Sequence, residues 1–482
     1  MNPRLIIKIF GLLILIIGIS MIPSVLWIMY YNESGLNAFL YSIIICLVSG
    51  TLLFGLNYNV QKKISVKESF FIVGFGWIIA GLFGSLPFVF SGIFPTYSDA
   101  FFETVSGFTT TGSSVIKNVE IIGKGVLFWR SFTHWLGGMG IIVLFVALFP
   151  FLGASGRNLM KFESPGPIKS GIKPKTADTA RYLWYIYFGF TFIEIILLAL
   201  FGMNLFDSMC HSFGTMATGG FSTLNKSIAG YESVVIEFII TFFMICAGLN
   251  FSLYYSLLHC NYKTLFKDVE FKTYIGIISI SILLTAAILY FNNYYNSFLT
   301  SLRYAGFQIV SILTTTGYAT ADFNQWPSFC KILLITLMFV GGCAGSTAGG
   351  MKVIRVIILY KFAKLQIFRT IYPNAIVTLK LENHPFPKHI LFQILGFFVL
   401  AVLIFISGSL FVSLFNYDIE TSASAVAATL WNIGPGIAKV GAIENFSFFP
   451  QPVKYVLSFF MIIGRLELFT VLVFLSPSFW RN

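Results

Sequence analysis

The residues of this chain that could do chemistry are small, uncharged and rich in hydroxyl groups, and they recur as one short phrase. The phrase reads FTTTGSSVIKN, ATGGFSTLNKS and LTTTGYATADF in three places, and ATLWNIGPGIAKVG is a degenerate fourth copy. Four copies in one chain indicate an internal repeat. One glycine in each copy serves as a reference point, at intervals of 107, 98 and 117 residues: Gly112, Gly219, Gly317 and Gly434.

These residue types suit the coordination of a desolvated alkali cation. Such an ion needs oxygen atoms in place of its water shell, and backbone carbonyls supply them when they all turn inward. Glycine accepts the positive φ that this requires, and flanking Thr or Ser adds uncharged hydroxyl oxygens. A single TTTG is more typical of a turn between helices, but four copies in register favour a selectivity filter. The predicted ion-binding residues are Thr110, Thr111, Gly112, Thr218, Gly219, Gly220, Thr315, Thr316, Gly317, Asn432, Ile433 and Gly434.

The composition places these phrases in a membrane protein. Of the 482 residues, 57% are hydrophobic and 10% are charged, whereas a soluble domain carries about 25% charged residues. Apolar runs of about 20 residues recur along the chain, which is enough to cross a bilayer as helices. They do not alternate as the strands of a transmembrane barrel would. The six cysteines have neither CxxC pairing nor metal-ligand spacing, so we expect no disulfide framework.

Positive charge marks one face of the predicted membrane protein. The net charge of +12 is concentrated at both termini and in four polar segments between the apolar runs. By the positive-inside rule, we expect these segments and both termini on the cytoplasmic side. The same asymmetry explains the basic clusters without nucleic acid, while a partner protein and anionic lipid head groups are two alternatives for what docks there. The segments are 61–69, 156–181, 260–273 and 352–388.

With those segments inside, the apolar runs fall into pairs. Two spans at 5–31 and 37–60 come first, and four longer units follow, each with a span, a polar-aromatic stretch and a second span. The repeated phrase always lies in the middle stretch, on the outer side, where the chain can dip back into the membrane as a re-entrant loop. The four units cover about 70–153, 180–261, 273–368 and 388–477.

A run that can form a short helix precedes each reference glycine, and it would point its negative C-terminal end at the ion. Three runs open with a carboxylate, at Asp99, Asp207 and Glu420, which suits the positive end of a helix. The third run lacks this acid and carries Arg303 instead, so the symmetry is approximate. The predicted short helices are 99–107, 207–216, 301–313 and 420–431.

A glycine-rich segment, VGGCAGSTAGGMK, interrupts the second span of the third unit. Each glycine costs a helix about 1 kcal/mol relative to alanine, so five of them within ten residues should break it. Close helix packing through small residues is the alternative interpretation. We favour an irregular loop beneath the filter, because such a break needs a water-lined cavity to satisfy its backbone. The loop would include Gly341, Gly342, Gly345, Ser346, Thr347, Gly349 and Gly350.

Arg465 lies deep in the last apolar run, within FFMIIGRLELFTVLV. A cation at such a depth costs from about 2.5 kcal/mol upward. Direct pairing with Glu467 is unfavourable, because residues two apart point to different sides of a helix. One interpretation is that Arg465 snorkels to a surface or pairs with another helix. The other is that it faces the pore beneath the filter and hydrogen-bonds the third-unit loop, where its charge opposes cation passage when the gate is shut.

Together these motifs resemble the membrane subunit of the Trk/Ktr/HKT potassium transporter superfamily, and they are closest to its TrkH/TrkG branch. The resemblance covers essentially the whole chain. It is carried by AFFETVSGFTTTGSSV, THWLGGMGIIVL, MATGGFST, LTTTGYATADF, GGCAGSTAGGMKVIR and NIGPG. The segment ESPGPIKSGIKPKTADTARYLWYIYF and the two extra N-terminal spans favour TrkH over KtrB.

The resemblance implies an all-α polytopic membrane protein with four M1–pore helix–M2 repeats in pseudo-fourfold arrangement and two extra N-terminal transmembrane helices. It assigns the gate to the glycine-rich loop and supports a pore-facing Arg465. Gly112 favours K+, because some HKT members with serine at that position prefer Na+. The expected domains are 1–66 for the two N-terminal helices, 67–170 for repeat 1, 171–268 for repeat 2, 269–384 for repeat 3 with its broken M2, and 385–482 for repeat 4.

The expected function is K+ uptake across the bacterial inner membrane, with both termini cytoplasmic. The resemblance also implies a homodimer in the lipid membrane and a cytoplasmic regulatory subunit with nucleotide-binding RCK domains. The alternative function is a secondary transporter that couples K+ or Na+ to protons, for which Glu194 and Glu467 are candidate relay groups. We do not expect an enzyme, because the sequence contains no HExxH, GxSxG or paired-carboxylate arrangement.

Overall fold

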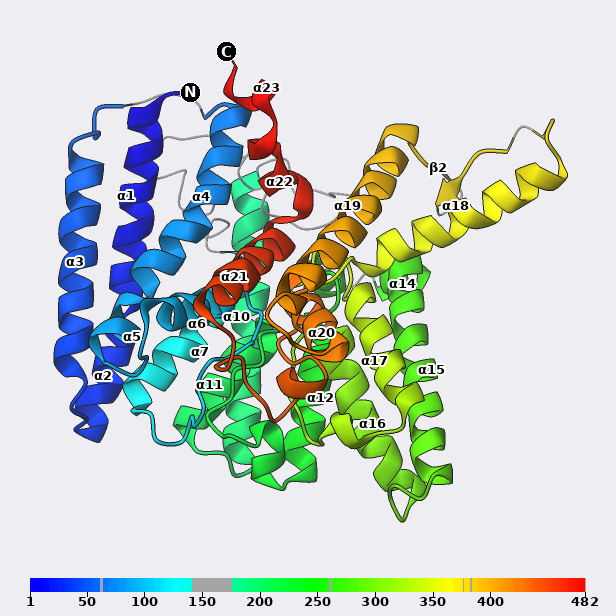
Figure 1. Cartoon of the computed structure of the whole chain (residues 1–482), viewed down its shortest axis with the longest axis horizontal. Coiled ribbons are helices and arrows are strands. Elements are labelled where there is room, and N and C mark those ends of the chain that lie inside the picture. Colours follow the sequence, from blue (N-terminus) through cyan, green and yellow to red (C-terminus); the bar gives the residue numbers. More distant parts are fainter. Residues whose placement is uncertain (61–63, 141–175, 260–261, 376, 382–383, 482) are drawn as a thin grey trace.

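The chain folds almost entirely into helices, as the sequence predicts (Figure 1). The computed structural model describes residues 1–60, 64–140, 176–259, 262–375, 377–381 and 384–481. Within these ranges the one sheet is a small hairpin of β1 (Lys380–Leu381) and β2 (His384–Pro385). Six helices in the described ranges are long and apolar enough to cross a membrane, or seven when a sharply bent pair is counted as one. The all-α polytopic fold class is thus confirmed.

The N-terminal part forms a helical hairpin beside the rest of the molecule. α1 (Pro3–Ser20) is followed by α2 (Ile22–Tyr31), and α3 (Leu36–Gly55) returns antiparallel along α1. The two backbones touch, since a Cβ built on Gly50 would lie 2.9 Å from the carbonyl oxygen of Gly11. Apolar helices associate in lipid through such close approach of small residues. Lipid tails are as apolar as the side chains, so the hydrophobic effect does not drive two helices together there, and close packing does so instead.

The rest of the described chain repeats one pattern four times: a first-span helix, a short helix and the start of a second span (Figure 1). The first-span helices are α4 (Val66–Gly84, continued by α5, Leu86–Phe90), α10 (Thr176–Leu200), α15 (Val269–Phe291) and α19 (Lys388–Ser413). The short helices are α6 (Tyr97–Phe108), α11 (Leu205–Met216), α16 (Phe298–Leu313) and α20 (Ile419–Leu430). The second spans begin with α7 (Lys124–Gly138), α12 (Val234–Ala247), α17 (Ser328–Val340) and α21 (Gln451–Leu466).

These elements close into a ring. Each short helix packs against the first-span and second-span helices of its own repeat. Each second span also contacts the short helix of the next repeat, through the pairs α7 with α11, α12 with α16, and α17 with α20. The series closes when α21 of the fourth repeat packs on α6 of the first. This cyclic packing surrounds one axis with the four short helices.

Each short helix begins with a side-chain cap. The capping residues are Thr96, Asn204, Ser297 and Asp418, and each accepts a hydrogen bond from a backbone N–H of the first turn. The expected carboxylates follow in the first turns of α6, α11 and α20, at Asp99, Asp207 and Glu420. Caps and carboxylates stabilise the positive end of a helix. The opposite, negative end of each short helix leads directly into a copy of the repeated phrase.

The second spans of repeats 2, 3 and 4 are all interrupted, whereas the sequence predicted an interruption in repeat 3 alone. α12 is followed by α13 (Phe251–Leu258) after a bend of 95°. A long loop separates α17 from α18 (Val353–Ile371), and α21 passes to α22 (Leu468–Leu472) through Glu467 at a φ of 63°. The bend in repeat 2 has its own cap, because the Asn250 side chain accepts from the Ser252 N–H. The single predicted break was therefore an underestimate.

The described ranges also bear on the predicted domain limits. The limit 66/67 falls at the first residue of α4, 268/269 directly precedes α15, and 384/385 falls within β2. The limit 170/171 lies outside the described residues, as do 141–153 of the first repeat's second span and 156–175 of a basic segment. Both termini lie at one end of the molecule, and α18 extends away from the bundle (Figure 1).

Candidate functional site

All four short helices end in the same way, at the four copies of the repeated phrase. In each copy, the residue two before a glycine of positive φ adopts a left-handed conformation, with φ of 53° to 57°. The next residue donates its N–H to the carbonyl five residues earlier, as in Thr111 to Ser106 at 2.9 Å and Ile433 to Ala428 at 2.8 Å. Glycine usually occupies such a left-handed helix end. The left-handed residues are Thr110, Thr218, Thr315 and Asn432.

Left-handed threonine is strained, since a β-branched side chain crowds the backbone there. Strain of this kind persists only where the surroundings over-determine it, and it clusters at functional sites. Thr110 and Thr315 therefore mark the phrase as more than a turn.

One glycine in each phrase has a positive φ: Gly112 (85°), Gly220 (78°), Gly317 (82°) and Gly434 (100°). In the second repeat this residue is Gly220, so Gly219 was the wrong reference point and lies one residue too early. Gly219 is needed for another reason, because a Cβ there would lie 2.5 Å from the ring of His134. His134 is fixed in place by a 2.7 Å hydrogen bond between its Nδ1 and the carbonyl of Gly107. Two adjacent glycines thus serve two separate constraints.

The four glycines lie beside one another in a ring of backbone carbonyls. A Cβ built on Gly112 would lie 2.2 Å from the carbonyl oxygen of Gly219, and one on Gly220 would lie 2.0 Å from that of Thr316. A Cβ built on Gly317 would lie 2.1 Å from the carbonyl oxygen of Ile433, and one on Gly434 would lie 2.8 Å from that of Thr111. Each loop thus presents the carbonyl before its glycine to the neighbouring loop. The order of contacts is cyclic, like the packing of the helices.

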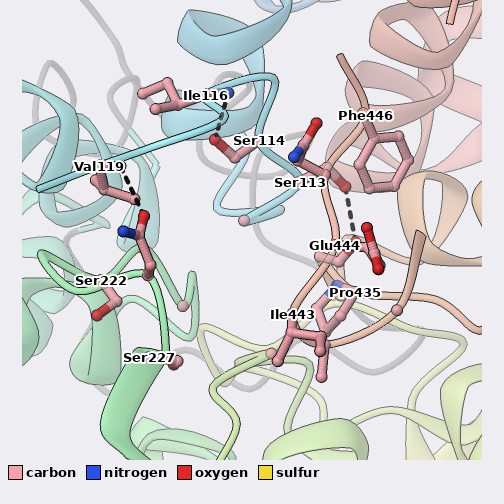
Figure 2. Close-up of a pocket in the computed structure, with 18 of the residues that line it drawn as sticks. Ser113, Ser114, Ile116, Val119, Ser222, Ser227, Pro435, Ile443, Glu444 and Phe446 are labelled. Atoms are coloured by element: carbon pink, nitrogen blue, oxygen red, sulfur yellow. Dashed lines mark hydrogen bonds between the residues drawn. The ribbon is translucent and has the colours of Figure 1, made fainter. Parts of the chain in front are cut away.

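All four positive-φ glycines border one cavity of about 120 Å³ that is open to the surface. Figure 2 shows this funnel, with Ser113, Ser222 and Pro435 contributed by three different repeats. Ser113 Oγ donates to the carbonyl of Gly434 at 2.9 Å and so ties the first loop to the fourth. The mouth is polar and leads directly to the ring of carbonyls.

Hydroxyl groups lie on the other side of the ring. Thr109 and Thr111 share a hydrogen bond of 2.7 Å, and Thr314 and Thr316 share the equivalent bond of 2.8 Å. The hydroxyl oxygen of Thr110 is buried and has no hydrogen-bond partner among the described residues. An unsatisfied buried oxygen is uncommon in a folded protein.

One buried and one partly buried ion pair hold two of the short helices. Lys454 in α21 pairs with Asp99 in α6 at 2.6 Å. Arg303 in α16 pairs with Glu237 in α12, with two contacts of 2.6 and 2.7 Å. Each pair joins a short helix to the second span of the preceding repeat, with the charges exchanged. Arg303, which breaks the acidic pattern in the sequence, thus has a specific partner that sequence reasoning missed.

A third pair lies inside the first repeat and borders the funnel. Glu103 in α6 and Arg130 in α7 are both buried and meet at 2.6 Å. Glu103 also accepts from Ser114 Oγ and from the Val115 N–H, which follow the first loop. Arg130 donates to the carbonyl of Ser222 in the second loop. These contacts fix two loops to one rigid pair.

The glycine-rich segment of repeat 3 forms the predicted irregular loop, and it lies directly against the ring. Gly341, Gly345 and Gly350 have φ of 73° to 76°, which no helix contains. The Gly349 N–H donates to Thr315 Oγ1 at 2.6 Å, and the Gly350 N–H donates to the carbonyl of Trp431 at 3.1 Å. The loop is thus hydrogen-bonded to two of the four phrases. Gly342, Ser346 and Thr347 complete the loop.

The interruptions of the other repeats converge on this loop. The Cys343 N–H donates to the carbonyl of Gly248 at 2.9 Å, and Thr347 Oγ1 donates to that of Ala247 at 3.1 Å. Arg465, at the end of α21, donates to the carbonyl of Thr347 at 2.7 Å and to those of Gly137 and Gly138 at 2.6 Å each. Arg465 therefore bridges the loop and the C-terminal end of α7. The hydrogen bond to the loop that the sequence analysis considered is present.

Positive side chains border the space beyond the loop. A cavity of only about 10 Å³ lies there, bordered by Lys352, Arg355 and Arg465. Arg355 pairs with Glu467 at 2.7 Å, which links the third and fourth repeats, and its guanidinium lies 4.0 Å from the centre of the Phe397 ring. The Lys352 ammonium donates to the carbonyl of Ala348 within the loop. The space is narrow, and Glu467 borders it together with the three basic side chains. The sequence motif did not predict the contacts of Lys352 and Arg355.

The chain is similar to known proteins over nearly its whole length. Residues 35–482 match the model of the TrkH family, described as cation transport protein. The chain is 39% identical to the Trk system potassium uptake protein TrkH of Salmonella typhimurium, across 100% of both chains. It is 32% identical to the Trk system potassium uptake protein TrkG of Escherichia coli, across 100% of this chain and 99% of that one. The crystal structure of the potassium transporter TrkH from Vibrio parahaemolyticus superimposes with a TM-score of 0.89, at 36% identity and with 100% of both chains covered.

Proposed function

The chain belongs to the TrkH family of cation transport proteins, and on this premise we propose that it carries K+ into the cell through the ring of carbonyls. As a member of a transport family it is a multi-pass membrane protein and not an enzyme. The observation that carries the proposal is the cyclic contact of Gly112, Gly220, Gly317 and Gly434 with the carbonyl of the adjacent loop. Carbonyls brought together at one level replace the water shell of a K+ ion.

The test is ion flux through the purified protein. In liposomes loaded and diluted to give a K+ gradient, the protein should carry Rb+ or K+, and excess Na+ should compete weakly. Equal competition by Na+ and K+ would contradict a K+ filter formed by Thr110–Gly112, Thr218–Gly220, Thr315–Gly317 and Asn432–Gly434. Liposomes with heat-inactivated protein provide the baseline.

The gate in this proposal is the loop 341–350 together with Arg465. The loop is hydrogen-bonded to Thr315 and Trp431 at the inner end of the ring. Three basic side chains and one acid, Glu467, border the narrow space beyond it, and this excess of basic groups opposes a cation there. Opening requires the loop to leave Thr315 and the Arg465 guanidinium to leave the Thr347 carbonyl. The glycines give the loop the freedom to do so.

The proposal includes the surroundings of the protein. The chain lies in the bacterial inner membrane with both termini cytoplasmic, which the basic segments near 260–273 and 352–388 support. It functions as a homodimer and is regulated by a cytoplasmic subunit with nucleotide-binding RCK domains. Light scattering of the purified protein measures the first, and co-purification with the regulatory subunit at physiological salt measures the second. A monomer that binds no such subunit would contradict both.

A second candidate function, proton-coupled transport, is favoured by one observation. Glu194 in α10 is fully buried, and neither carboxyl oxygen has a hydrogen-bond partner among the described residues. An isolated charged carboxylate in such a place is costly. Glu467, the other candidate relay group, is instead paired with Arg355. If transport is coupled, Glu194→Gln should abolish K+ accumulation driven by an imposed proton gradient; unchanged accumulation excludes a role for Glu194.

A further inference from the structure

Glu270 is a buried carboxylate that contacts the glycine-rich loop from another element. It lies in the first turn of α15 and is 8% exposed. Its Oε1 accepts from the Ala344 N–H at 2.8 Å and from the Ile354 N–H at 3.0 Å. Ala344 lies within the loop, and Ile354 lies in the first turn of α18 beyond it. One oxygen atom thus joins both ends of a nine-residue stretch, 345–353.

This arrangement sets the width of the loop. Hydrogen bonds to a carboxylate are about twice as strong as those between neutral groups, and they strengthen where water is excluded. The second bond also satisfies an N–H at the start of α18, where no intrahelical acceptor exists. While both bonds hold, residues 345–353 are closed into an arch that reaches Thr315 through Gly349. The backbone adds a bond of its own between the two ends of the loop, from the Val353 N–H to the carbonyl of Gly342 at 3.0 Å. Losing one Glu270 bond therefore loosens the arch without freeing it completely.

Glu270 also connects the arch to the surface at the end of the molecule where α15 begins. Asp268, two residues earlier, caps α15 by accepting from the Phe271 N–H at 2.7 Å. Before it lies α14 (Tyr262–Lys267), a short helix with exposed Lys263. A displacement of α14 therefore moves the first turn of α15 and, with it, the oxygen that holds the loop.

We propose that Glu270 is a positioning residue that holds the glycine-rich loop closed and transmits movement of the α14–α15 corner to it. The inference rests on the proposed function, because it assumes that this loop is the gate. The carboxylate does not touch the transported ion. It acts by fixing the two N–H groups between which the loop is suspended.

The test uses the loop's own thiol as a reporter. Cys343 is 1% exposed in the closed arrangement. In a full-length chain whose other five cysteines are replaced by alanine, a membrane-impermeant thiol reagent is added to inside-out vesicles, and the rate of Cys343 modification is measured. The variants are Glu270→Asp, which keeps the charge but is one methylene too short to reach both N–H groups, Glu270→Gln, which keeps the acceptor oxygen, and Glu270→Ala. Glu232→Asp, at an exposed acid outside the site, is the matched control.

We expect modification of Cys343 to rise about tenfold or more in Glu270→Asp and Glu270→Ala, in keeping with the loss of a charged hydrogen bond. Glu232→Asp should react as slowly as the parent chain. Glu270→Gln keeps the acceptor oxygen in its weaker, neutral form, so its rate should lie well below that of Glu270→Asp and above that of the parent chain. This rescue by Gln separates a hydrogen-bonding position from a general structural need for charge. An unchanged rate in Glu270→Asp, or an equal rise in Glu270→Gln, would overturn the inference. If Glu270→Ala does not insert stably, Glu270→Asp decides the question.

Flux measured on the same vesicles separates this inference from the proposed function. Basal K+ flux should rise in Glu270→Asp along with Cys343 modification, because the loop no longer closes the path. If Cys343 becomes reactive while flux stays at the parent level, Glu270 does hold the loop but the loop is not the gate. If flux rises while Cys343 stays protected, the role of Glu270 in holding the loop is overturned.

Discussion

At the scale of single residues, different physical constraints determine the residue type at neighbouring positions of the repeated phrase. Gly112 is fixed by the backbone, since its φ is 85° and a carbonyl lies where its Cβ would be. Gly219 is fixed by the imidazole of His134. Thr110, Thr218 and Thr315 adopt a strained, left-handed conformation. Substitutions at these positions should therefore fail for distinguishable reasons.

Gly112→Ser should weaken discrimination against Na+. Its Cβ would lie 2.2 Å from the Gly219 carbonyl oxygen, so that oxygen must move out of the ring. The K+/Na+ flux ratio in liposomes measures the effect. The matched control is Gly92→Ser, because Gly92 has a similar φ of 68° but nothing within 4 Å of its Cβ position. The control should lose about 1 kcal/mol of stability and keep its selectivity. An equal ratio in Gly112→Ser and the parent chain would argue against the filter assignment.

Arg465→Ala should raise basal K+ flux, because it removes a charge from the narrow space beyond the loop. The same change should lower stability, since Arg465 also donates to Gly137 and Gly138 at the end of α7 and the last carbonyls of a helix favour a cation. Flux per folded protein, normalised by size-exclusion chromatography, separates the two effects. Arg465→Lys keeps the charge without the guanidinium fork and should be intermediate. Reduced flux in correctly folded Arg465→Ala would contradict the barrier role.

At the scale of elements, the third short helix departs from its counterparts but keeps their anchoring. α6 is tied by Asp99 to Lys454, and α16 is tied by Arg303 to Glu237. Lys454 and Glu237 each stand at the fourth position of a second-span helix. The geometry is thus kept while the signs are exchanged. An arginine that looks misplaced in the sequence is one half of an inverted pair.

Exchanging Arg303 and Glu237 should restore the stability that either single substitution removes. Arg303→Glu and Glu237→Arg each place two like charges together at a partly buried site, and each should cost about 2 kcal/mol or more of stability. The double variant should recover most of that loss. Thermal unfolding in detergent, followed by a double-mutant cycle, measures the coupling. Additive losses in the double variant would show that the two side chains do not depend on each other.

At the scale of the whole molecule, the family, the helical fold class and the four repeats could be predicted from the sequence. A positive φ favours glycine, and a membrane-spanning helix needs a long apolar run, so both features are visible in the residue types. The interruptions of repeats 2 and 4 could not, since Gly248 and Asn250 are isolated and Glu467 reaches a φ of 63° without being a glycine. Glu270 resembles any acid in the first turn of a helix, and only the folded chain brings it to the loop. The roles of the filter and gating residues stay predictions.

The closed ring predicts that the chain can be divided. A break between residues 381 and 384, in the small β1–β2 hairpin, cuts little hydrogen-bonded backbone. The two fragments should reassemble when expressed together, because α20 and α21 contact α17 and α6 of the larger piece. Co-purification and restored Rb+ flux measure the outcome. Neither fragment alone should show selective flux; selective flux through residues 1–381 would contradict the need for four repeats.

The contact between the last repeat and the first also sets the order of events during biosynthesis. Thr111 and Gly434, which face each other in the ring, are 323 residues apart. The ribosome synthesises the chain from its N-terminus, so the first three repeats are made before the fourth. The ring of oxygens is completed only near the end of translation. A nascent chain that lacks the fourth repeat therefore has no closed ring.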